Sequence, residues 1–223
     1  MKKRLTRFLP FLLAFTIALP SYSVFAEEEN QAKETQTNET NETQADETTA
    51  NDTLSLAAET AVLIDAASGE ILYDKDADKK MYPASITKLM TILLALENGK
   101  LTDEITFSHD AVYNIEPGSA HIAILEGETL TLEQVLRAII LRSANEASNG
   151  VAEYVDGSVE AFAKHMTERA KELGCTNTNF VNANGLFDEN HYTTAHDMAL
   201  IARELLKHEE YRSMMSETDY EIP

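Results

Sequence analysis

The sequence is organised around one ten-residue stretch, Tyr82-Pro83-Ala84-Ser85-Ile86-Thr87-Lys88-Leu89-Met90-Thr91. Apolar residues continue from Lys88 to about Glu97, and Asn98-Gly99 supplies a stop, so the pattern predicts a helix that begins near Ser85. Residues three apart share a helix face, so the Ser85 hydroxyl and the Lys88 amine are expected one turn apart. A neutral lysine in that place can take the proton of a serine, which is the geometry that acyl transfer needs.

A second polar pair, Ser143 and Asn145, lies in a break between two predicted helices. Ser143 can relay a proton to a leaving amine, and Asn145 can hydrogen-bond both to a substrate amide and to Lys88. The alternative for this pair is a polar loop with a helix cap. For the first tetrad, the alternative is an ordinary helix with a capping serine and a lysine stem lying along apolar surface. Against that alternative, this is the only Ser-x-x-Lys among the chain's 12 serines.

With these motifs the chain resembles the low-molecular-mass penicillin-binding proteins, most closely the D-alanyl-D-alanine carboxypeptidases, over residues 57–223. Four further segments carry the resemblance: 62–72, 141–148, 184–186 and 191–199. It implies that Ser85 is the nucleophile, that Lys88 is the general base, and that Ser143 and Asn145 form the second motif. It also implies an α+β, β-lactamase/transpeptidase-like fold with a helical lobe and an antiparallel sheet. The implied substrate is a peptidoglycan stem peptide ending in D-Ala-D-Ala, the implied covalent inhibitors are β-lactams, and no cofactor is implied.

The family's third motif, Lys followed by Thr or Ser and then Gly, does not occur in this sequence. We therefore expect a truncated chain with a partial sheet, without the later strands, the C-terminal β domain and the helix that would meet a membrane surface. An edge without its partner strands is a liability, so we expect the chain alone to be inactive or poorly folded. The alternative function is a non-catalytic exported module that binds peptidoglycan or a protein. A β-lactamase is a third hypothesis, against which stands the lack of a clear Glu-based deacylation motif after the second motif.

The first 53 residues differ in composition from the rest of the chain. Residues 1–26 combine a basic start, an apolar stretch from Phe8 to Leu19 and Val24-Phe25-Ala26, which is typical of a cleaved export signal. Residues 27–53 hold nine acidic residues, one base (Lys33) and no large apolar residue, which predicts a disordered acidic tether. The sequence thus predicts an exported protein, close to the cell wall or membrane, with its folded part in residues 54–223.

Charge and the remaining residues exclude several classes of function. A formal net charge of −20 argues against a nucleic-acid binder. Cys175 is the single cysteine, so no intramolecular disulfide forms, and a buried spectator thiol is expected. The six histidines lack metal-ligand spacing, so no metal is expected.

Periodicity and turn residues predict the order of the secondary structure elements. An antiparallel hairpin is expected from strands 60–64 and 70–73, and short strands are expected at 105–107 and 121–125. Ser108 is expected to cap a brief helical turn, and Thr131 with Gln134 reads as a capping box. Further helices are expected at 131–141, 146–154 and 158–173, and one is expected to begin after Thr194.

Overall fold

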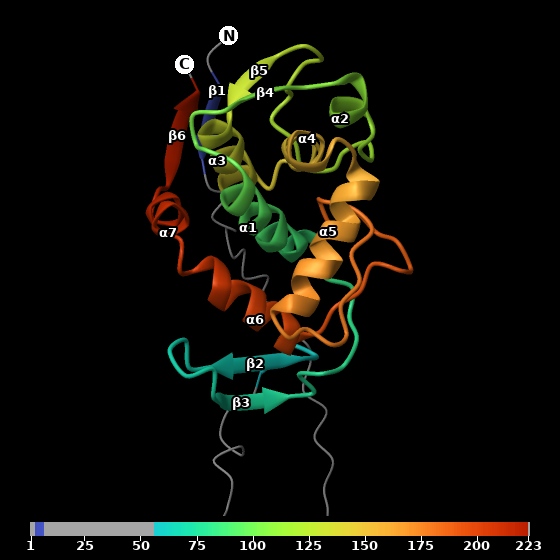
Figure 1. The fold of residues 1–223 in the computed structure, drawn as a ribbon, viewed down its shortest axis with the longest axis vertical. Helices are drawn as coiled ribbons and strands as arrows, with labels where there is room; N and C mark the ends of the chain where they lie inside the picture. The colour runs from blue at the N-terminus through green and yellow to red at the C-terminus, as the bar shows by residue number, and fades with distance from the viewer. Residues whose placement is uncertain (1–2, 7–55, 223) are drawn as a thin grey trace, which may run out of the picture. The chain divides into compact units, whose positions relative to one another are not determined.

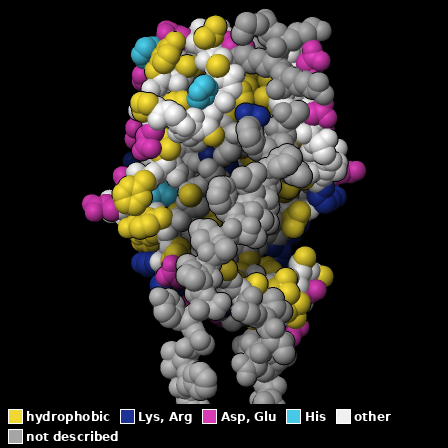
Figure 2. Space-filling model, turned by 180° about the vertical axis from the view of Figure 1, so that it is seen from behind, with side chains coloured by type: hydrophobic (Ala, Val, Ile, Leu, Met, Phe, Trp, Pro, Cys, Tyr) yellow, Lys and Arg dark blue, Asp and Glu magenta, His cyan; other side chains and the backbone are white. Residues whose placement is uncertain are grey.

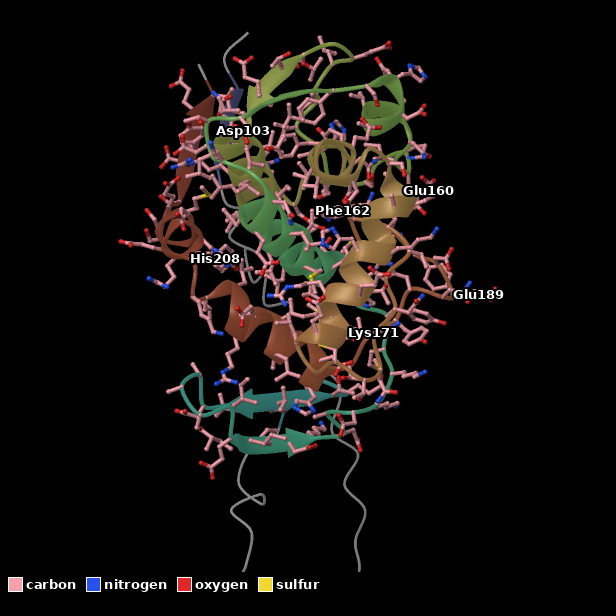
Figure 3. All side chains as sticks on the ribbon, viewed as in Figure 1. Asp103, Glu160, Phe162, Lys171, Glu189 and His208 are labelled. Carbon is pink, nitrogen blue, oxygen red and sulfur yellow. The ribbon has the colours of Figure 1, made fainter. Side chains whose placement is uncertain are left out.

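Helix α1 (Lys88–Asn98) lies among the other long helices in the computed structural model, which describes residues 3–6 and 56–222 (Figure 1). Its apolar residues Met90, Leu93 and Leu94 are fully buried. Phe162, labelled in Figure 3, is buried in the same core. The helices that contact α1 are α3 (Leu132–Arg142), α4 (Asn145–Asp156), α5 (Val159–Glu172) and α6 (Ala195–Leu205). The predicted helical lobe is therefore confirmed.

Polar caps set the helix starts where the sequence places them. The Thr131 hydroxyl accepts from the Gln134 amide, and the Gln134 side chain accepts from the Thr131 amide, which is the predicted capping box. The Ser158 hydroxyl caps α5 by accepting from the Ala161 amide, and the Thr194 hydroxyl caps α6 by accepting from the Asp197 amide. Ser108 caps the short helix α2 (His109–Tyr113). Each cap satisfies an amide that the first helical turn leaves unpaired.

Within residues 3–6 and 56–222, the strands form three separate two-stranded antiparallel sheets. The predicted hairpin is present as β2 (Ala61–Ile64) and β3 (Ile71–Lys75), and the predicted strand near residue 105 is β4 (Glu104–Thr106). The sequence did not predict β5 (Thr129–Thr131), which pairs with β4, or helix α7 (Glu209–Met215). It also did not predict the third pair, which joins β1 (Lys3–Thr6) to β6 (Asp219–Ile222).

The predicted strand at residues 121–125 is wrong. This segment has an irregular backbone, and Ala123 has a positive φ of 57° that no regular strand contains. The amides of Ile122 and Ile124 donate to the side chain of Glu146 instead of to a neighbouring strand. A distant buried carboxylate therefore decides the local conformation, and the sequence pattern around residue 122 does not reveal it.

Two of the sequence predictions fall mainly outside the described residues. Apart from β1, the export signal of residues 1–26 is outside them, and so is the whole acidic tether of residues 27–53. Both stay predictions. Among the residues that the structure describes, no helix is long and apolar enough to cross a membrane.

Candidate active site

Ser85 and Lys88 lie one turn apart at the start of the central helix. Ser85 is exposed in the 3₁₀ turn η1 (Ala84–Thr87), and Lys88 is the first residue of α1. The Lys88 Nζ donates to Ser85 Oγ across 3.3 Å. The predicted juxtaposition of a hydroxyl and an amine is therefore present, between an exposed serine and a lysine that is only 4% exposed.

Two further acceptors hold the Lys88 amine. Asn145 Oδ1 accepts from Nζ at 2.8 Å and the carbonyl of Asn184 accepts at 2.5 Å. Together with Ser85 Oγ, they match the three donors of a protonated lysine. Asn145 is thus where the sequence predicted it, opposite Lys88. The Asn184 carbonyl was not predicted, because a backbone acceptor leaves no side-chain signature.

Burial lowers the pKa of Lys88 to about 8, and the negative charge of Glu146 opposes that shift. An amine with this pKa is partly neutral near physiological pH, as a proton acceptor must be. The lowering comes from desolvation of the amine, as expected for a buried lysine, whereas the charge that acts on it is a carboxylate and not a neighbouring positive group.

The loop that follows Asn182 packs directly on the backbone before Ser85. Gly185 has a φ of +83°, and a Cβ added there would lie 1.9 Å from the Ala84 carbonyl oxygen. Ala84 itself has a φ of 49°, which is uncommon for a residue other than glycine. Only a glycine at position 185 permits this approach, which brings the Asn184 carbonyl within reach of Lys88.

His191 contacts the same 3₁₀ turn, η1, through a hydrogen bond to Thr87. Its Nδ1 accepts from the Val181 amide, so the neutral ring carries its proton on Nε2 and donates to Thr87 Oγ1 at 2.8 Å. Burial lowers the pKa of His191 to about 4, which keeps the ring neutral. His191 therefore has a structural role, joining the Val181 backbone to the η1 turn, and the sequence did not predict that role.

Ser143 reaches the same cavity but not the same hydrogen-bond network. It ends α3 in a left-handed conformation with a φ of 55°. With Ser85 and Lys88 it lines a cavity of about 290 Å³ whose other walls are mostly apolar. Among the described residues, its buried hydroxyl has no hydrogen-bond partner. The structure therefore assembles Ser85, Lys88 and Asn145 into one network and adds Ser143 at the cavity wall.

Cys175 is a free, buried cysteine. Burial raises the pKa of the Cys175 thiol to about 12, so it stays protonated and unreactive, as the sequence predicted for a spectator. Within residues 3–6 and 56–222, no cluster of three or more His, Cys, Asp or Glu side chains is arranged to hold a metal ion.

Several characterised proteins are similar to this chain in sequence. The D-alanyl-D-alanine carboxypeptidase DacF of Bacillus subtilis is 43% identical over 161 residues, which are 70% of this chain and 41% of the relative. The D-alanyl-D-alanine carboxypeptidase DacC of Escherichia coli is 37% identical over 160 residues, 68% of this chain and 40% of the relative. The chain thus spans about two fifths of the length of these relatives.

Solved structures and a family match agree with that likeness. The crystal structure of the D-alanyl-D-alanine carboxypeptidase DacD from Francisella tularensis is 32% identical with a TM-score of 0.67, over 73% of this chain and 40% of that one. A mutant of the Streptomyces K15 DD-transpeptidase is 25% identical with a TM-score of 0.68, over 72% and 65%. The predicted α+β, transpeptidase-like fold is therefore confirmed. Residues 44–222 match the family Peptidase_S11, described as D-alanyl-D-alanine carboxypeptidase, and the chain belongs to that family.

Proposed function

We propose that this chain carries the nucleophile and the base of a serine-type D-Ala-D-Ala carboxypeptidase. The observation that carries the proposal is the exposed residue Ser85, whose hydroxyl lies 3.3 Å from the amine of a buried lysine with a pKa lowered to about 8. In the first step, neutral Lys88 takes the proton of Ser85, and the serine oxygen attacks the carbonyl carbon of the penultimate D-Ala. First-turn amides and the helix dipole favour the oxyanion that forms.

The leaving D-Ala needs a proton when the peptide bond breaks. Lys88 holds the proton taken from Ser85, and Ser143, which lines the same cavity, relays it to the leaving amine in this proposal. The product is an ester between Ser85 and the shortened stem peptide. Water then attacks the ester, Lys88 takes its proton and passes it to the Ser85 oxygen as the ester bond breaks, and the serine and the neutral lysine are regenerated.

Asn145 orients both the base and the substrate. Its Oδ1 already accepts from Lys88, so its Nδ2 is left to donate to a carbonyl of the bound peptide. A β-lactam presents a comparable acyl group to Ser85, so covalent inhibition by β-lactams belongs to the same proposal. Peptidoglycan lies outside the cytoplasmic membrane, and the export signal proposed for residues 1–26 with the acidic tether of residues 27–53 fits that location.

The test uses a chimera, because the chain spans about two fifths of its relatives. Residues 56–222 replace the matching part of the Bacillus subtilis relative, and purified protein is mixed with a labelled penicillin and with a pentapeptide ending in D-Ala-D-Ala. We expect an ester on Ser85 by mass spectrometry and release of D-Ala. The Ser85→Ala chimera should do neither.

A matched control shows whether the loss of activity is specific to Ser85 or follows the removal of any serine. Ser68→Ala removes a serine in the β2–β3 turn, where its hydroxyl bonds to Asp65, and should leave both activities unchanged. A folded chimera that binds the pentapeptide without forming an ester would instead favour the non-catalytic binding module.

A further inference from the structure

Glu146 is a buried carboxylate placed directly beside the site. It occupies the first turn of α4, next to Asn145, and is 1% exposed. Burying an ionised carboxylate is costly unless its oxygens accept hydrogen bonds. Its Oε1 accepts from the Ile122 amide at 2.7 Å and, more weakly, from the Ile124 amide at 3.5 Å.

Those hydrogen bonds tie the segment of residues 120–124 to the start of α4. The Asn145 amide makes a second tie by donating to the Ala120 carbonyl at 2.9 Å. The side chain of the same Asn145 accepts from Lys88. The first turn of α4 therefore contacts both the irregular segment of residues 120–124 and the amine of Lys88. We expect a change in the conformation of that segment to alter the position of Lys88 through Asn145.

The second carboxylate oxygen of Glu146 differs from the first in its hydrogen bonding. Among the described residues, Oε2 has no hydrogen-bond partner, although it is buried. The residue lines a cavity of about 350 Å³ together with apolar residues such as Val112, Ile115 and Leu125, and with the ionisable side chains of Glu116 and His121. In such mostly apolar surroundings a charge acts over a longer distance than in water.

Lys88 is otherwise surrounded by neutral groups. Ser85 from η1, Asn145 from α4 and the Asn184 carbonyl from the 182–187 loop accept its hydrogen bonds, and none is charged. His191, which supports the turn through Thr87, is kept neutral by burial. The carboxylate that acts on Lys88 is that of Glu146, and it favours the protonated amine.

We propose that Glu146 is a positioning residue of this site, which fastens residues 120–124 to α4 and supplies the negative charge that limits how readily Lys88 gives up its proton. The inference rests on the proposed function, because Lys88 is its base. Without that charge, burial alone would push the pKa of Lys88 further down. A lysine with a lower pKa is more often neutral but is a weaker base, so the carboxylate balances the two requirements.

The test measures Lys88 directly, without turnover. The full chain is labelled with ¹³Cε-lysine, and the Lys88 resonance is followed by NMR against pH in wild type, Glu146→Gln and Glu153→Gln. We expect the Glu146→Gln midpoint to fall by about half a pH unit or more, because the opposing charge is gone. Glu153 lies on the same helix as Glu146, and its carboxylate accepts a hydrogen bond from Ser108. Glu153→Gln removes that negative charge and should leave the Lys88 midpoint unchanged.

Hydrogen exchange of the Ile122 amide reports the fastening role separately. Glu146→Gln keeps an oxygen acceptor and should keep the protection of this amide, whereas Glu146→Ala should lose it about tenfold. Equal midpoints in wild type and Glu146→Gln, or equal protection in wild type and Glu146→Ala, would overturn the proposal.

Glu146→Asp covers the case in which the glutamine variant does not fold. It keeps the charge but shortens the reach by one methylene, so we expect an unchanged Lys88 midpoint with weaker Ile122 protection. The reverse pattern would also overturn the proposal. Absence of acylation in the chimera would count against the proposed function and leave these NMR results unaffected.

Discussion

The β2–β3 hairpin and helix α1 bury their apolar side chains to very different extents. Helix α1 buries seven of its eleven residues: Lys88, Met90, Thr91, Ile92, Leu93, Leu94 and Ala95. No residue of β2 or β3 is fully buried, and Leu63 and Leu72 are 57% and 55% exposed. Figure 2 shows hydrophobic side chains at the surface in the lower part of the view, where the hairpin lies.

This difference in burial indicates that the helical core contributes more to the stability of the fold than the β2–β3 hairpin does. Helices satisfy their own backbone, so α1 needs only apolar neighbours, which the other long helices provide. A two-stranded hairpin leaves edges and one face open, and such a pair has marginal stability by itself. The candidate site belongs to the self-sufficient part, so substitutions there should have large effects and substitutions in the hairpin small ones.

The largest effect is expected for Lys88→Met, which removes the base and keeps a side chain of similar length in an apolar setting. In the chimera, the rate of acylation by a labelled penicillin should fall by about 10³-fold, the middle of the range for loss of a general base. The circular dichroism spectrum should not change. A rate within tenfold of the parent would eliminate lysine as the base.

Gly185→Ala is expected to have the next largest effect, on stability. The new Cβ would meet the Ala84 carbonyl at 1.9 Å in a left-handed backbone conformation, so unfolding in urea should show a loss of about 3 kcal/mol or more. Gly118→Ala is the matched control, because Gly118 has a similar φ of +82° with no atom within 4 Å of the new Cβ. Its loss should be about 1 kcal/mol, and equal losses would contradict the close approach at Ser85.

The pH dependence of stability should carry a signature of Lys88. Its folded pKa of about 8 lies below the ordinary lysine pKa of 10.5, so the unfolded chain binds more protons between these two values. Stability should therefore rise as pH goes from about 8 to about 10.5, by up to ~3 kcal/mol in total. Urea midpoints measured across this range test it. Lys88→Met should remove the rise, and a rise that persists in that variant would assign it to another group.

The smallest effect is expected in the hairpin. Replacing the exposed Leu63 and Leu72 by Thr keeps strand-forming residues and removes surface that is already in water, so stability should change by less than about 0.5 kcal/mol each. Leu93→Ala in the core should cost about 2–5 kcal/mol by the same urea measurement. A large loss from the hairpin variants would show that the hairpin is not the weakly supported region described above.

The sequence predicted the elements that depend on neighbouring residues better than those that depend on distant ones. The α1 start, the capping box at Thr131 and the cap at Thr194 follow from short-range rules, because a helix is specified by residues three and four positions apart. The hairpin followed from turn residues between two apolar runs. Strands β5 and β6 and the irregular 120–124 segment were missed, because their partners lie far away in the sequence.

The sequence by itself determined the pairing of Ser85 with Lys88, since their spacing of three places both on one helix face whatever surrounds them. It also indicated Asn145 as a partner, through the break after α3. Only the tertiary structure decided the properties of the base: burial by packed helices lowers its pKa, the Asn184 carbonyl holds it, and Glu146 opposes the shift. These effects depend on solvent exclusion and on distances between segments far apart in the chain, which no local pattern encodes.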